Sequence, residues 1–124
     1  MSRPARREVR ISTADGTVVA ERCVVAERLF ARMRGLLGRS ALPPGEGLLI
    51  QHAPSVHMFF MRFPIDVVFI DRDRRVLRVS VGLAPWRIAG ARGAVAALEL
   101  PARSTVGLDL APGTRLELVE LPAP

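Results

Sequence analysis

Two dense apolar runs dominate the middle of the chain, over residues 56–61 and 65–70, and Arg62-Phe63-Pro64 separates them. Such continuous apolar runs are typical of strands that are covered on both faces. Elsewhere, short apolar or alternating segments bounded by Gly and Pro also predict strands. Asp15-Gly16 lies between two β-branched runs and predicts a hairpin. The expected strands are residues 8–13, 17–25, 47–51, 56–61, 65–70, 75–81, 94–100 and 114–121.

One segment has a different period. Over about residues 26–37, apolar residues recur at three- and four-residue steps while Arg and Glu occupy the other face, which predicts an amphipathic helix. A short helical turn is expected near residues 104–108. The fold class that follows is mainly β (small α+β), a compact barrel-like sheet of seven to eight short strands with one covering helix. The length predicts a single domain, 1–124, with residues 1–7 as a mobile tail.

The composition is strongly basic, with a formal net charge of +6, yet every basic residue is Arg and the chain has no Lys, Asn or Tyr. This profile is typical of GC-rich codon usage. The charges are scattered, and the aromatic residues lie in expected apolar strands rather than among the Arg. A surface for single-stranded nucleic acid needs the two interleaved. We therefore expect no nucleic-acid partner, and a basic module that contacts nucleic acid is the weakest alternative.

No apolar run approaches the ~20 residues that span a bilayer, and the basic N-terminus is not followed by the apolar segment of a secretory signal. We expect no membrane insertion and a cytoplasmic location. The single cysteine, Cys23, excludes an internal disulfide and a Cys-rich zinc site. Because Cys23 lies in an apolar strand beside Val24 and Val25, we expect it to be buried and unreactive.

Few polar groups interrupt the central apolar runs, and burying them is costly unless each finds a partner. If Arg62-Phe63 forms a tight connection between strands 56–61 and 65–70, His57 and Asp66 become diagonal neighbours on one sheet face. His57 would then be a base oriented by Asp66. Alternatively, Asp66 accepts backbone N–H bonds from a nearby loop and fixes the sheet, with His57 packing beside it. We favour this structural interpretation, because a cleft is needed before a buried carboxylate indicates catalysis.

The sequence contains no metal-ligand pattern such as HxH, HExxH or CxxC, and no Gly-rich phosphate loop of the right polarity. We therefore expect no metal and no cofactor. Trp86 is the only tryptophan and stands in a long loop between Pro85 and Arg87. It either covers the core or lines a ligand site, with Arg87 stacked on it. No catalytic residue is assigned, and the candidate binding pocket is His57, Arg62, Asp66, Trp86 and Arg87.

These segments also carry a resemblance to a known family. The motifs are RGLLGR at 34–39, HMFFMRFPIDVVFID at 57–71, PW at 85–86, LELP at 98–101 and PG at 112–113. With them, the chain resembles the family called domain of unknown function 192, small prokaryotic proteins without an established biochemical role, over about residues 8–119. The resemblance implies a compact β-rich domain with minor helices, and it brings no cofactor or catalytic residue.

Two positions depart from the pattern of similar family members. Met58 stands where Thr is frequent after the His, so a mechanism that needs this hydroxyl is in doubt. Arg103 stands where Gly is frequent, which implies that the turn after Pro101 does not need a positive φ.

Taken together, these features predict a non-catalytic binding or accessory module that recognises a small ligand or a protein segment. The alternative is a small hydrolase-like enzyme that uses His57 as base, oriented by Asp66. The enzyme ranks second because the chain supplies no second acid and no clear nucleophile.

Overall fold

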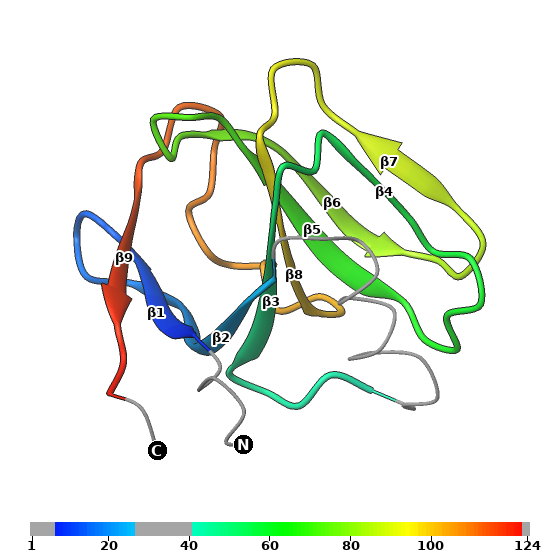
Figure 1. The fold of residues 1–124 in the computed structure, drawn as a ribbon, viewed down its shortest axis with the longest axis horizontal. Coiled ribbons are helices and arrows are strands. Elements are labelled where there is room, and N and C mark those ends of the chain that lie inside the picture. Colours follow the sequence, from blue (N-terminus) through cyan, green and yellow to red (C-terminus); the bar gives the residue numbers. More distant parts are fainter. Residues whose placement is uncertain (1–6, 27–40, 123–124) are drawn as a thin grey trace, which may run out of the picture.

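The computed structural model describes residues 7–26 and 41–122, and Figure 1 shows how their strands are arranged. Seven strands form one sheet in the order β6-β5-β8-β3-β2-β1-β9, and β4 pairs with β7 in a second, small sheet. Neighbouring strands are antiparallel apart from β2 and β3, which are parallel. The strands are β1 (Glu8–Thr13), β2 (Val18–Ala26), β3 (Glu46–Gln51), β4 (Ser55–His57), β5 (Ile65–Ile70), β6 (Val76–Leu83), β7 (Ile88–Gly90), β8 (Ala96–Pro101) and β9 (Leu116–Glu120).

The two edges of the seven-stranded sheet approach each other, so the sheet curls into a half-barrel (Figure 1). Arg75, just before β6, forms an isolated bridge with Arg115, just before β9. The Val76 N–H donates to the Thr114 carbonyl over 2.8 Å at the same place. The predicted mainly β, barrel-like architecture is therefore confirmed in its coarse form.

Side chains of β5 alternate between two apolar clusters, and all six residues of this strand are buried. Ile65, Val67 and Phe69 belong to an outer cluster that also contains residues of β4 and β7. Val68 and Ile70 belong to an inner cluster built from strands around the half-barrel. The sequence prediction that this apolar run is covered on both faces is confirmed.

The hairpin predicted at Asp15-Gly16 is also present, with β1 and β2 paired antiparallel. Gly16 has a φ of +92°, which only glycine adopts without strain. In the small sheet, β4 and β7 approach closely at Gly90, where an added Cβ would lie 3.0 Å from the Pro54 carbonyl oxygen. These two glycines hold a turn and a close strand contact that a side chain would disturb.

Three sequence predictions of local structure are wrong. The strand expected over 56–61 ends at His57, and residues after it form turns. The long loop expected around Trp86 contains a strand, β7, directly after Arg87. Residues 104–108 form successive turns rather than a helical turn, because Arg103 and Gly107 both have positive φ and break any right-handed helix.

The amphipathic helix predicted at about 26–37 falls outside the described residues, except for Ala26, which ends β2. The expected mobile tail, 1–7, falls outside them as well, except for Arg7. No helix in the ranges 7–26 and 41–122 is long and apolar enough to cross a membrane.

Candidate functional site

The hairpin between β4 and β5 that would have made His57 and Asp66 diagonal neighbours is absent. His57 ends β4, which pairs with β7, whereas Asp66 lies in β5, which pairs with β6 and β8. Among the described residues, no hydrogen bond joins Asp66 to His57. The prediction that the two residues are diagonal neighbours on one sheet face is therefore wrong, and its physical reason is the early end of β4.

Asp66 is completely buried and accepts hydrogen bonds from strand β6 and from the loop that follows β8. Its Oδ1 accepts the N–H groups of Gly82 at 2.7 Å and Arg103 at 2.8 Å. Its Oδ2 accepts the Thr105 N–H at 3.0 Å and the Thr105 hydroxyl at 2.5 Å. Four donors satisfy the capacity of a carboxylate, so Asp66 ties the loop after β8 to the end of β6 at one mouth of the half-barrel. This is the bonding that the structural interpretation predicts.

Arg103 corrects a second expectation. Its φ is +66°, so the turn after Pro101 does adopt the left-handed conformation although no glycine stands there. In this conformation the Arg103 N–H donates to Asp66 Oδ1, and the Thr105 N–H, two residues further on, donates to Asp66 Oδ2.

The tip of the small sheet carries a cluster of exposed apolar side chains, which we call the aromatic tip. It consists of three rings, Phe59, Phe60 and Trp86, and of Ile88 on β7. Their exposed fractions are 37%, 62%, 58% and 64%. The ring centroids of Phe59 and Trp86 lie 5.8 Å apart, and those of Phe60 and Trp86 lie 4.9 Å apart. His57 extends the row, since its ring lies 4.7 Å from that of Phe59. The four rings therefore form one continuous row, in which neighbouring rings are tilted against each other by 30° to 60°.

The backbone that carries two of these rings has a strained conformation. Phe60 has a φ of +67° and Trp86 a φ of +69°, values that are genuine outliers for bulky side chains. Hydrogen bonds between the loops fix them: the Trp86 N–H donates to the Met58 carbonyl, and the Met58 N–H donates to the Arg87 carbonyl, each over 2.7 Å. Left-handed residues cost about 1 kcal/mol or more each, and such strain gathers at functional sites.

The same two loops supply two exposed arginines, Arg62 and Arg87. No ion pair or side-chain hydrogen bond of either guanidinium occurs within the described part of the chain. Of the predicted pocket residues, His57, Arg62, Trp86 and Arg87 thus stand in the loops and strand of the aromatic tip, whereas Asp66 is engaged elsewhere.

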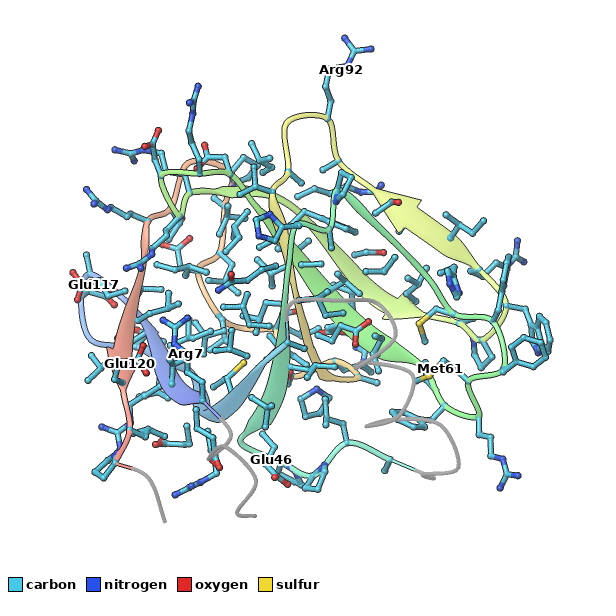
Figure 2. The ribbon with its side chains drawn as sticks, viewed as in Figure 1. Arg7, Glu46, Met61, Arg92, Glu117 and Glu120 are labelled. Atoms are coloured by element: carbon cyan, nitrogen blue, oxygen red, sulfur yellow. The ribbon has the colours of Figure 1, made fainter. Side chains whose placement is uncertain are left out.

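The sequence interpretation missed Phe59 and Phe60, which it assigned to a buried strand. Met58 and Met61 are buried, and the Met61 N–H donates to the Met58 carbonyl, so the pair anchors a turn that directs both phenylalanines outward. Figure 2 shows Met61 at the base of this tip. The three-residue spacing of the methionines is the one signal that could have indicated the turn.

Glu99 was also missed. It is completely buried on β8, and its strand neighbours are Leu48 on β3 and Val67 on β5. Those neighbours belong to the outer cluster, so Glu99 and Asp66 lie on opposite faces of the sheet. The only sequence signal is a carboxylate between Leu98 and Leu100.

Cys23 is completely buried in the inner cluster, as predicted. Burial raises the pKa of its thiol from 9.0 to about 12, because the surrounding apolar side chains disfavour the thiolate. A thiolate nucleophile is therefore unavailable at neutral pH. Among the described residues, no group of three or more His, Cys, Asp or Glu could hold a metal ion.

Comparison with known proteins agrees with the sequence motifs. The sequence model of a family described as "Uncharacterized ACR", DUF192, matches residues 10–118. The chain belongs to the DUF192 family. One DUF192 relative, the "UPF0127 protein" of Thermococcus sibiricus (strain DSM 12597 / MM 739), is 33% identical over 90 residues. That match covers 67% of this chain and 56% of the relative, so the chain spans little more than half of the relative's length.

Two crystal structures share this DUF192 fold. One, from Sinorhizobium meliloti 1021, is described as a "putative transcription regulator"; it is 25% identical, with a TM-score of 0.76, covering 94% of this chain and 98% of its own. The other is a protein of unknown function from Novosphingobium aromaticivorans DSM 12444, 24% identical with a TM-score of 0.70, covering 89% and 83%. The second likeness establishes the fold alone.

Proposed function

We propose that this DUF192 protein is a non-catalytic docking module, and that its aromatic tip binds an extended, acidic segment of a partner protein. The observation that carries the proposal is the outward position of Phe60 and Trp86. Both side chains are mostly exposed, and both stand on backbone that bulky residues rarely adopt. Stability alone does not favour this arrangement, because it costs strain without burying the rings.

The chemistry of the tip is that of a protein-binding hot spot. Trp and Arg are the side chains most enriched where truncation weakens protein complexes. Here Trp86 lies in ring contact with Phe59 and Phe60, and Arg87 follows it in the chain. The ring contacts already restrict these side chains, so a partner pays little additional entropy to order them.

The shape of the cluster favours a polymer over a small ligand. Small-molecule sites are concave and enclose most of the ligand surface. A row of rings with centroids 4.7–5.8 Å apart offers instead a series of exposed ring surfaces against which apolar side chains can pack. An extended segment covers such a row along its length.

The charge of the tip favours an acidic partner. Arg62 and Arg87 make no ion pair with other described residues, and they stand within two positions of Phe60 and Trp86 in the chain. A carboxylate beside an apolar anchor would give each arginine a charge-assisted bond. Binding should accordingly weaken as salt is added.

The test begins with a random-peptide library displayed on phage and selected on the immobilised protein. Enriched peptides are then titrated into the protein while the emission of Trp86, the only tryptophan, is followed. We expect enriched peptides to combine an apolar anchor with Asp or Glu. Ile88→Ala should weaken their binding at least about tenfold. Val106→Ala, which truncates a similarly exposed apolar residue outside the tip, is the matched control and should leave affinity unchanged.

Two results would contradict docking of a protein segment. The first is a failed peptide test: the selection enriches no common sequence, or the enriched peptides bind Ile88→Ala and the native chain equally. The other is saturable binding to vesicles of phosphatidylglycerol that is lost in Ile88→Ala, because the tip would then be a lipid-binding surface.

A second candidate is stacking of single-stranded nucleic acid on the same rings. The sequence argument against it assumed that the aromatic residues lie in buried strands, and the exposed position of Phe59, Phe60 and Trp86 removes that objection. Exposed rings beside arginines are what such a surface requires. This candidate is also supported by the similar structure from Sinorhizobium meliloti, which is described as a "putative transcription regulator".

The protein segment is favoured because three further arginines close together in the chain, Arg72, Arg74 and Arg75, lie beyond the opposite end of β5. Five residue steps along a strand separate Ile65 from Ile70, roughly 17 Å at the usual rise per residue. Oligonucleotides of thymidine that quench Trp86 emission, with a quench abolished in the Arg62→Ala/Arg87→Ala double variant, would establish the second candidate instead.

A further inference from the structure

A second surface feature lies at the opposite mouth of the half-barrel from Asp66. It is a cavity of about 180 Å³ beside the carboxyl ends of β3 and β5 and the start of β8. Its apolar floor includes Leu49, Ile70 and Ala96, all from the inner cluster. Mouths of barrels are places where small ligands bind, because the strands position loop residues around an open end.

The wall of this cavity is basic. Arg72 and Arg74 line it, both are exposed, and neither guanidinium forms an ion pair within the described part of the chain. Arg7 lines it too, but its guanidinium bonds to Glu120 at 2.6 Å, and Figure 2 shows these two side chains together near β9.

One carboxylate, Asp71, also lines the cavity. Its Oδ1 accepts the N–H groups of Asp73 at 2.8 Å and Arg75 at 2.9 Å, so its charge is partly compensated within its own turn. The charge of the lining therefore remains positive, since Arg72 and Arg74 outnumber Asp71 and Arg7 is paired with Glu120.

The backbone at the cavity is strained in the same manner as at the aromatic tip. His52 and Arg74 both line it, and their φ values are +58° and +62°. The Arg74 N–H donates to the Asp71 carbonyl over 3.0 Å, and the Leu116 N–H donates to the Arg74 carbonyl over 2.8 Å. The turn thus holds an arginine where glycine would fit more easily.

We propose that this cavity binds a small organic anion, a carboxylate or phosphate monoester on a short apolar body. The carboxylate or phosphate group of the ligand would bond to Arg72 and Arg74, whose guanidinium groups suit planar or tetrahedral oxyanions. The apolar body would cover the floor of Leu49, Ile70 and Ala96. The site is independent of the aromatic tip, because no residue is common to both.

The volume restricts the size of the ligand. At about 30 Å³ for each water in the liquid, the cavity holds the equivalent of about six waters. Drug-sized or dinucleotide ligands need cavities of about 300 Å³ or more. A single-ring or short branched anion is of the size that fits inside the cavity.

Amide shifts in ¹H–¹⁵N NMR spectra of the full chain test the proposal. Phenyl phosphate and phenylacetate are the probes, inorganic phosphate tests the head alone, and benzyl alcohol tests the apolar body alone. We expect saturable shifts at His52, Arg72, Arg74 and Val95 with at least one of the two organic anions, and weaker binding of both controls. The probe that binds more tightly shows whether the cavity prefers a phosphate monoester or a carboxylate.

Arg74→Gly is the decisive variant, because glycine suits the positive φ and the fold should persist. It should weaken binding at least fivefold, the loss of one charge-assisted bond. Arg103→Gly makes the same change at a φ of +66° at the other mouth and should leave affinity unchanged. The proposal is overturned if neither organic anion saturates, if inorganic phosphate binds as tightly, or if the two variants behave alike.

Discussion

The thiol of Cys23 should control how the stability of this protein changes in alkali. The chain has no Lys and no Tyr, and Arg keeps its proton beyond pH 12. The thiol is therefore the one side chain whose usual titration falls between about pH 9 and pH 12. Burial raises its pKa in the folded protein from 9.0 to about 12. Few proteins offer a single titrating group in this range.

The direction and size of the effect follow from proton linkage. Below pH 9 the thiol is protonated in both the folded and the unfolded chain, so its contribution to stability is fully present. Above pH 9 the unfolded chain releases the proton and the folded chain keeps it, so the free energy of unfolding falls. The fall is about 1.4 kcal/mol per pH unit and ends near the folded-state pKa of about 12. At about pH 10.5 the loss is roughly 2 kcal/mol.

Urea unfolding followed by circular dichroism, at several pH values from about 8 to 10.5, measures this loss. Cys23→Ala should abolish most of the pH dependence, at a constant cost of about 1 kcal/mol for the lost side chain. A thiol reagent should label the native chain slowly and the unfolded chain at once. A native chain whose stability is flat across this range, or a Cys23→Ala variant that loses stability as steeply, would refute the reasoning.

Two other substitutions test the loops around Asp66. Asp66→Ala leaves the donors of Gly82, Arg103 and Thr105 unsatisfied, so it should lower the free energy of unfolding by about 3 kcal/mol or more. Thermal or urea unfolding measures this, and a loss below about 1 kcal/mol would mean that water replaces the carboxylate. Arg103→Gly keeps the N–H bond and removes the strain of a φ of +66°, so it should stabilise the fold by about 0.5–1 kcal/mol; destabilisation would show that the Arg103 side chain has a packing role.

The elements that the sequence predicted well are those with a strong local signal. Asp15-Gly16 determines the first hairpin through turn chemistry, and the apolar run of β5 needs no partner information to be identified as a buried strand. The same apolar reasoning failed at 56–61, because hydrophobicity does not separate a strand from a turn whose methionines are buried and whose phenylalanines face solvent. The short strand β7 has no period that distinguishes it from loop.

At the candidate site, too, the sequence predicted the features with a local signal and missed those that depend on distant parts of the chain. Burial of Asp66 in an apolar run predicted that it needs donors, and the structure supplies them. Which donors these are depended on long-range contacts, since Thr105 lies 39 residues further along the chain. The aromatic tip arises from two loops that meet through backbone bonds of Met58 with Trp86 and Arg87, and no local pattern encodes that meeting.

The central claim is that the aromatic tip exists for binding and not for folding. Phe60→Gly tests it most directly, with Arg103→Gly as the matched change at a positive φ outside the tip. Removing the Phe60 ring loses its contact with Trp86, worth about 0.5–1.5 kcal/mol, and relieves backbone strain of similar size. The free energy of unfolding of Phe60→Gly should therefore stay within about 1 kcal/mol of the native value.

The measurement is the pair of values for each variant: the free energy of unfolding, and the Kd for a peptide selected on the native chain. The account predicts that Phe60→Gly folds normally and binds the peptide at least about tenfold more weakly, while Arg103→Gly binds it with native affinity. A Phe60→Gly variant that unfolds far more easily, or one that binds the peptide as the native chain does, would contradict the account.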